Sequence, residues 1–223
     1  MTPLGVAVIG AGRMGANHAR VLSSMQRTEL RAVCDRDPPL AARVAEACAG
    51  SVPVNSVDQV IGRDDIHAVV IASPTAAHCD LAVRCMDAGL HVLVEKPMAS
   101  TVSECERMMA ASQAAERRLM VGHIERFNPS VMQLKAFLDE GLVGNVYYVE
   151  TVRSGPFPRR LYGSKDGVVI DLAVHDLDLV NFLFDEIAQV YAHHITTGVA
   201  ESQGAQDIYC RVMLRTQAGL LGN

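Results

Sequence analysis

The sequence lacks features that would point to a membrane, a nucleic acid or a metal. No apolar run approaches the roughly 18 residues that suggest a membrane-spanning helix. The formal net charge is −5 and no basic patch stands out, so nucleic acid is not an expected partner. None of the six cysteines forms a C-x-x-C pair, which favours reduced, buried thiols over a disulfide framework or a zinc site. We therefore expect a soluble, cytoplasmic protein without a bound metal.

What is present is the pattern of a globular α/β protein. Hydrophobic residues make up 49% of the 223 positions, enough for a substantial core. Up to residue 122, short runs of Val, Ile and Leu alternate with amphipathic stretches, as in a parallel sheet covered on both faces. This alternation predicts a doubly wound Rossmann domain over residues 1–122. Strands are predicted at 5–9, 30–34, 68–72, 92–94 and 119–121, and helices at 14–25, 38–48, 76–88 and 101–117.

The pattern changes after residue 122 and predicts an α+β domain over 123–223 with a mostly antiparallel, open sheet. A turn is expected at 216–219, and the sequence ends where a hairpin partner should begin. We therefore expect a truncated domain with an unpaired or oligomer-paired edge at 206–215, and a protein that aggregates or turns over poorly beside a longer version. Strands are predicted at 146–153, 188–196 and 206–215, and helices near 130–138 and 170–184.

A glycine-rich motif, Gly10-Ala11-Gly12-Arg13-Met14-Gly15, connects the first predicted strand to a helical stretch. In a dinucleotide site the first glycine permits a tight turn, the second lets the backbone approach a pyrophosphate, and the third allows close helix–strand packing. Asp35 ends the second strand, where a carboxylate accepts hydrogen bonds from a ribose and repels a 2′-phosphate. Asp35 favours NAD, although Arg36 beside it would suit the phosphate of NADP. A purely structural strand–turn–helix is the alternative.

Two motifs lie where later strands end. Ser73-Pro74-Thr75-x-x-His78 follows an apolar run, and we expect Thr75 and His78 to face the cofactor, because ligands bind beyond the carboxyl ends of parallel strands. Helix capping by Thr75 is an equally good interpretation. Glu95-Lys96-Pro97 follows the next strand, where Lys96 is expected to hydrogen-bond a substrate hydroxyl or carbonyl. The alternative interpretation of this Glu-Lys pair is a solvated loop end.

One segment of the second domain combines a histidine with carboxylates. On an α-helix, Asp171, His175 and Asp178 lie at i, i+4 and i+7 and share one face. A histidine oriented by a carboxylate is a candidate general base. A helix N-cap and a partly buried structural histidine are the alternatives, and a metal site would need ligands from elsewhere.

The predicted domain junction contains a polar cluster over residues 122–129. Arg126 is expected to clamp an anionic group, and His123 or Asn128 to bond sugar hydroxyls. A salt-bridged hinge between the domains is an equally good interpretation. His18, on the first predicted helix, is interpreted as structural.

Taken together, these motifs resemble the Gfo/Idh/MocA family of sugar oxidoreductases. The resemblance rests on Gly10–Gly15, Pro74-Thr75-x-x-His78, Glu95-Lys96-Pro97 and Asp171-x-x-x-His175, in that order. It implies a Rossmann domain that binds NAD, with NADP as the alternative, and a second domain whose open sheet often forms oligomer contacts. It also implies that Lys96, Asp171 and His175 match the family's catalytic positions, with Lys96 or His175 as the formal base.

The resemblance further implies a sugar or nucleotide-sugar substrate. Segments 122–129 and 171–178 look most like bacterial UDP-N-acetylglucosamine 3-dehydrogenases, which implies oxidation of a C3 hydroxyl. Four arginines at positions 126, 153, 159 and 160 would suit its phosphates. An inositol or free-sugar dehydrogenase and a non-catalytic NAD- or sugar-sensing protein are the alternatives. The residues expected to bind cofactor are Gly10, Gly12, Arg13, Met14, Gly15, Asp35, Arg36, Ser73, Pro74, Thr75, His78, Glu95 and Lys96; those expected to bind substrate are Lys96, His123, Arg126, Asn128, Asp171 and His175.

Overall fold

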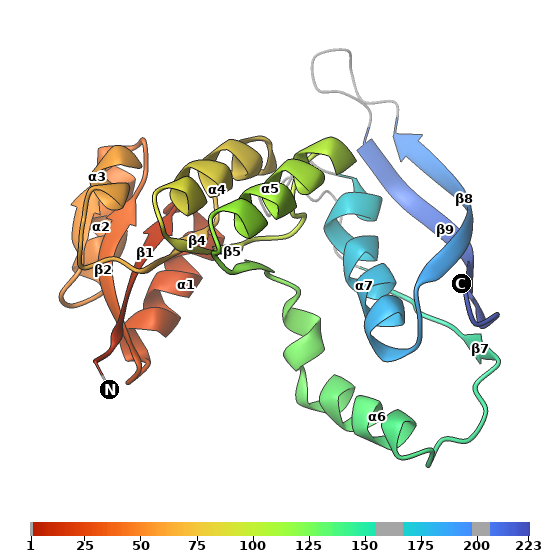
Figure 1. Ribbon diagram of the computed structural model, residues 1–223. Helices are drawn as coiled ribbons and strands as arrows, with labels where there is room; N and C mark the ends of the chain where they lie inside the picture. Colours follow the sequence, from red (N-terminus) through yellow and green to blue (C-terminus); the bar gives the residue numbers. More distant parts are fainter. Residues whose placement is uncertain (1, 155–166, 198–205) are drawn as a thin grey trace. The chain divides into compact units, whose positions relative to one another are not determined.

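The computed structural model describes residues 2–154, 167–197 and 206–223, and the chain divides into two compact units, residues 1–122 and 123–223 (Figure 1). Arg159 and Arg160, two of the arginines suggested for phosphate binding, lie outside the described residues. Within the described ranges, every helix is too short or too polar to cross a membrane.

Unit 1 is built on a six-stranded sheet in which every pairing is parallel. The spatial order is β3-β2-β1-β4-β5-β6, which is the order of a doubly wound dinucleotide-binding sheet. The order reverses between β1 and β4, so ligands are expected at the carboxyl ends of these two strands. The Rossmann fold predicted for the first domain is confirmed. The strands are β1 (Leu4–Ile9), β2 (Thr28–Cys34), β3 (Val52–Val54), β4 (Ala68–Ile71), β5 (His91–Val94) and β6 (Leu119–Val121).

Helices cover both faces of this sheet, because successive side chains of a strand point to opposite faces. One buried cluster joins Val8 of β1 to α1 and α2, and the other joins Ile9 of the same strand to α4 and α5. Helices α4 and α5 lie side by side (Figure 1). Burial on both faces explains why the strands are almost continuously apolar. The helices are α1 (Arg13–Ser24), α2 (Pro38–Glu46), α3 (Asp58–Ile61), the short 3₁₀ turn η1 (Thr75–Ala77), α4 (His78–Asp87) and α5 (Val102–Ala114).

Unit 2 is an α+β domain with a four-stranded sheet of order β7-β10-β9-β8. Strand β9 is antiparallel to both β8 and β10, and β10 is parallel to β7, so the sheet is mixed with mainly antiparallel pairs, as predicted. Its elements are η2 (Ile124–Phe127), α6 (Pro129–Asp139), β7 (Tyr148–Val149), the π-helical turn η4 (Val169–Ala173), α7 (Val174–Leu183), β8 (Ile187–Thr197), β9 (Gln206–Thr216) and β10 (Leu221–Gly222).

Several expectations for unit 2 differ from the structure. The strand predicted over 146–153 shortens to β7, because its partner β10 supplies only two residues for pairing. The edge expected on β9 is covered at Leu214 and Arg215, where β10 returns through a turn at Gly219, whose φ is +92°. The helix predicted over 170–184 is α-helical only from Val174 onward and begins with the π-helical turn η4.

Candidate functional site

The glycine loop after β1 is shaped by the absence of side chains at three positions. Gly10 has a φ of +100°, and a Cβ there would lie 2.6 Å from the carbonyl oxygen of Ala72. A Cβ on Gly15 would lie 1.7 Å from the carbonyl oxygen of Gly10, so α1 approaches the loop this closely only with glycine. Gly12 differs, because a Cβ there would meet nothing within 4 Å. The open space beside Gly12 suits a pyrophosphate.

The start of α1 offers the second requirement of an anion site. Among the described residues, no side chain caps this helix, and its first turn contains no acidic residue. The N–H groups of the first turn and the positive end of the helix dipole therefore face the same open space as Gly12. The residues present fit the pyrophosphate of a dinucleotide.

Asp35 follows β2, and its carboxylate is tied to the glycine loop. Oδ2 accepts the backbone N–H of Ala11 at 2.7 Å, and Oδ1 accepts that of Asp37 at 2.9 Å. The residue expected to bind a ribose therefore also fixes the loop expected to bind the pyrophosphate. Beside it, burial and the charge of Asp35 raise the pKa of the Cys34 thiol to about 11, so this buried cysteine stays protonated.

The loop after β4 leads to two of the residues expected to face the cofactor, Thr75 and His78. The His78 side chain is only 1% exposed, and its Nδ1 and Nε2 lie 3.0 Å and 2.9 Å from the carbonyl oxygens of Pro97 and Ser73. His78 therefore ties the loop after β4 to the loop after β5, and the contact with cofactor expected of it stays a prediction. Thr75 begins η1 and does not cap α4, which starts at His78. Among the described residues, the buried Oγ of Ser73 makes no hydrogen bond, and a hydroxyl in that state at this sheet edge suits a cofactor atom.

The loop after β5 begins with a buried carboxylate. Glu95 is 6% exposed; its Oε1 lies 2.7 Å from Nε2 of His18, and its Oε2 accepts the backbone N–H of Lys96 at 3.2 Å. Lys96 precedes a cis peptide bond to Pro97 and lies at the same sheet edge as the glycine loop. His18 is therefore part of this edge, which sequence reasoning missed because one histidine on a helix gives no signal of its partner.

In unit 2, Asp171 and His175 lie on either side of a change in helix geometry. Asp171 is in the π-helical turn η4 and His175 is in the first turn of α7. Their spacing is therefore not that of the continuous α-helix expected from sequence. Short π-helical turns are rare and are frequent at functional sites.

The Arg126 guanidinium is paired with a carboxylate of its own unit. It forms a bidentate pair with Asp178, with Nε–Oδ2 at 2.8 Å and Nη2–Oδ1 at 2.5 Å, and lies 5.2 Å from the ring centroid of Phe182. Asp178 is only 9% exposed, so its charge requires this partner. His123 Nε2 is also 3.6 Å from Asp178 Oδ1. These contacts are all within unit 2, and the anion clamp expected of Arg126 stays a prediction.

Two other polar side chains of unit 2 are likewise used internally. Asn128 Oδ1 accepts the N–H of Ser130 at 3.0 Å and so caps α6, a role that Asn followed by Pro at a helix start predicts. Arg153 bridges Asp176 at 3.0 Å and Glu125 at 3.1 Å. The contacts of Asn128 and Arg153 with substrate stay a prediction.

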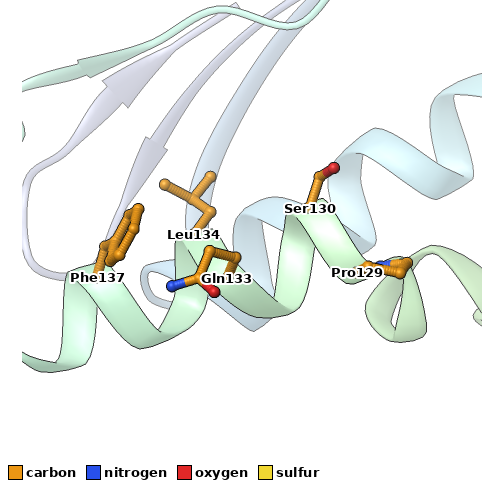
Figure 2. Close-up of a pocket in the computed structure, with 5 residues that line it drawn as sticks. All are labelled: Pro129, Ser130, Gln133, Leu134 and Phe137. Carbon is orange, nitrogen blue, oxygen red and sulfur yellow. The ribbon is translucent and has the colours of Figure 1, made fainter.

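A shallow hollow lies on α6, lined by one helix. Figure 2 shows Ser130, Leu134 and Phe137 among its side chains, and none of the residues predicted for catalysis lines it. Within the described ranges, no group of three or more His, Cys, Asp or Glu side chains is placed to hold a metal ion.

The comparisons with known proteins agree with this architecture. Residues 4–123 match the family model described as "Oxidoreductase family, NAD-binding Rossmann fold", and residues 131–223 match that of the GFO/IDH/MocA C-terminal domain. The chain belongs to the Gfo/Idh/MocA oxidoreductase family, and its N-terminal unit is an NAD-binding Rossmann domain.

Individual relatives extend the comparison. The chain is 37% identical over 193 residues to inositol 2-dehydrogenase 1 of Saccharopolyspora erythraea, covering 84% of this chain and 57% of that relative. The crystal structure of a myo-inositol dehydrogenase from Corynebacterium glutamicum has a TM-score of 0.84 at 30% identity, covering 99% of this chain and 67% of that one. The structure of the WlbA dehydrogenase from Bordetella pertussis in complex with NADH and UDP-GlcNAcA has a TM-score of 0.83 at 27% identity, covering 99% and 66%. The chain thus spans little more than half the length of the curated relative.

Proposed function

We propose that this protein catalyses the NAD-dependent oxidation of a secondary alcohol on a sugar or cyclitol ring. The observation that carries the proposal is the glycine loop of unit 1, where the space beside Gly12 and the carboxylate of Asp35 suit a dinucleotide. The names of the relatives support a ring with several hydroxyl groups, because they include inositol dehydrogenases and a complex with a nucleotide sugar. NAD, when bound, supplies the acceptor for the hydride that leaves the carbinol carbon.

Three residues have roles in the proton transfer that accompanies this oxidation. His175 takes the proton of the substrate hydroxyl, and Asp171 orients the ring and stabilises its protonated form. Lys96 donates a hydrogen bond to the same oxygen as it becomes a carbonyl. One proton and one hydride leave the alcohol, so the products are a ketone, a reduced nicotinamide and a proton. The family resemblance of the motifs supports these roles.

A cyclitol is the substrate class that the observations favour. The curated relatives with 35–37% identity include several inositol 2-dehydrogenases. Arg126 and Arg153, two of the four arginines suggested for the phosphates of a nucleotide sugar, are already paired with carboxylates of unit 2. The second candidate is a UDP-linked N-acetylhexosamine oxidised at C3. It is supported by the likeness of segments 122–129 and 171–178 to such enzymes and by the WlbA structure.

Absorbance of reduced nicotinamide distinguishes these candidates. The protein is incubated with NAD and, separately, myo-inositol, UDP-N-acetylglucosamine or glucose. Turnover of myo-inositol without turnover of the nucleotide sugar supports the first candidate, and the reverse supports the second. Lys96→Ala and His175→Ala should each remove turnover and leave NAD affinity nearly intact, since neither residue is needed to hold the pyrophosphate. NAD binding without oxidation of any ring alcohol would leave a sensor as the better interpretation.

A further inference from the structure

The buried carboxylate beside Lys96 has no part in the chemistry proposed above. Both oxygens of Glu95 have a donor, His18 Nε2 at 2.7 Å and the Lys96 N–H at 3.2 Å. A carboxylate is costly to bury unless its charge is compensated and hydrogen-bonded. The arrangement therefore fixes the position of the carboxylate and, through it, the backbone of Lys96.

The pair joins two elements that meet at the cofactor edge. His18 lies on α1, which begins at the glycine loop, and Glu95 follows β5. The N–H of Glu95 donates to the carbonyl of Ile71 at 2.9 Å, and a Cβ on Gly122 would lie 3.5 Å from Cδ of Glu95. The contact between His18 and Glu95 therefore joins α1 directly to the residue before Lys96.

The charge of Glu95 is maintained despite its burial. Burial raises the pKa of Glu95, but hydrogen bonds from His18 and the Lys96 amide, with electrostatic attraction to both residues, bring it below its ordinary value. The carboxylate is therefore ionised at neutral pH and remains an acceptor for both donors.

We propose that Glu95 and His18 are positioning residues that hold Lys96 in place for proton and hydride transfer. The proposal rests on the function proposed above, in which Lys96 contacts the reacting oxygen. The other side of Lys96 is also held, since the carbonyl of Pro97 contacts His78 Nδ1 at 3.0 Å. Transfer requires near-contact geometry, and a displacement of about 1 Å can cost about 100-fold in rate.

The first experiment separates catalysis from cofactor binding. Glu95→Gln and His18→Ala are expected to lower kcat about 10- to 100-fold and to change the Kd for NAD by less than about three-fold, because Lys96 moves while the glycine loop remains. His18→Gln offers a donor to Glu95 and should recover most of the activity. With substrate deuterated at the carbinol carbon, the isotope effect on kcat should rise in the impaired variants, as hydride transfer becomes more rate-limiting. His91→Ala, at the opposite end of β5, is the matched control and should leave kcat unchanged.

A second measurement does not depend on turnover. The sequence contains three lysines, so labelling by an amine-reactive reagent can be resolved by mass spectrometry. Labelling of Lys96 relative to Lys135 should rise more than about three-fold in Glu95→Gln and His18→Ala, because the loop is no longer fixed. His91→Ala should leave this ratio unchanged.

The outcomes distinguish the two proposals. If the unmutated protein oxidises no ring alcohol, the proposed function fails. If Lys96→Ala leaves turnover unchanged, the role of Lys96 is wrong, and the positioning role that rests on it fails while the proposed function stands. If Lys96→Ala removes turnover but Glu95→Gln and His18→Ala keep the parent kcat and labelling ratio, the positioning role alone is wrong. A fall in kcat that follows the loss of folded protein in thermal unfolding, with an unchanged isotope effect and labelling ratio, also overturns the positioning role.

Discussion

Gly12 and Gly15 belong to one motif, but their surroundings predict opposite effects of the same substitution. Gly15→Ala should destabilise unit 1 by about 2 kcal/mol or more, because its Cβ would overlap the carbonyl oxygen of Gly10. Gly12→Ala should leave the unfolding temperature nearly unchanged. It should weaken the binding of NAD at least about 10-fold, because the methyl group occupies the space left for the pyrophosphate. Thermal unfolding and NAD titration check the pair. Unchanged NAD affinity in Gly12→Ala would place the pyrophosphate elsewhere.

Asp35 is expected to select NAD over NADP. Its carboxylate repels a 2′-phosphate, so the unmutated protein should bind NAD more tightly than NADP, and Asp35→Ala should narrow the difference. Because Asp35 also accepts the N–H of Ala11, the same change should lower stability by about 1 kcal/mol. Titration with both cofactors measures the first effect and denaturant unfolding the second. Equal affinities in the unmutated protein would contradict the assignment.

The lowered pKa of Glu95 predicts that the stability of the folded protein depends on pH. Because the pKa of Glu95 is lower in the folded than in the unfolded chain, the folded state prefers the ionised form. This contribution is fully present above the unfolded pKa of about 4.3 and is lost as the pH falls through the folded pKa. The difference in unfolding free energy between the protein and Glu95→Gln should therefore shrink below about pH 4.3. Denaturant titration measures this difference in unfolding free energy. A difference that stays constant from pH 7 to pH 3 would contradict the prediction.

The strands and helices that the sequence predicts well are those whose hydrophobic pattern is set by the burial of their own side chains. In five strands of unit 1 most residues are apolar because both sheet faces are covered, and the sequence predicts these strands to within two residues. Strand β3 was missed because Val52-Pro53-Val54 contains a proline, which is disfavoured inside a sheet. The length of β7 depends on its partner strand, which periodicity cannot show.

The polar residues of the candidate site likewise include some that the sequence predicts and some that it does not. The glycine loop and Asp35 follow from local motifs, and the structure places them in contact. The partners of His78, Arg126 and His18 lie 19, 52 and 77 residues away in sequence. Hydrogen bonds over such separations are made by the tertiary fold, so residue type and spacing alone could not identify them.

At the level of elements, Arg126 holds η2 against α7 through Asp178. Arg126→Ala should lower the unfolding free energy by about 1–3 kcal/mol, because it leaves the buried Asp178 carboxylate without its bidentate partner. A double-mutant cycle with Asp178→Asn measures the coupling. Lys135→Ala, which removes an exposed i,i+4 pair with Asp139, is the control and should cost no more than about 0.5 kcal/mol. If Arg126→Ala weakens the binding of UDP-N-acetylglucosamine without a loss of stability, Arg126 acts as the anion clamp.

Across the whole molecule, the buried apolar core is unevenly divided. In the part of the chain that the structure describes, both hydrophobic clusters consist of residues from unit 1. Among the described residues of unit 2, the buried apolar side chains are Val180, Leu214 and Leu220. Since burial of apolar surface is the dominant favourable contribution to folding, most of this contribution belongs to the NAD-binding unit.

This distribution predicts that residues 1–122 fold and bind NAD on their own. The fragment contains the six-stranded sheet, both clusters, the glycine loop and Asp35, on which we expect both properties to depend. Its unfolding by denaturant should be cooperative, and its Kd for NAD should lie within about three-fold of that of the 223-residue chain, a difference of less than about 0.7 kcal/mol. Gly12→Ala in the same fragment is the control and should fold but bind NAD weakly. A fragment that unfolds without cooperativity, or that folds and loses NAD binding, would show that residues beyond 122 contribute to the cofactor site.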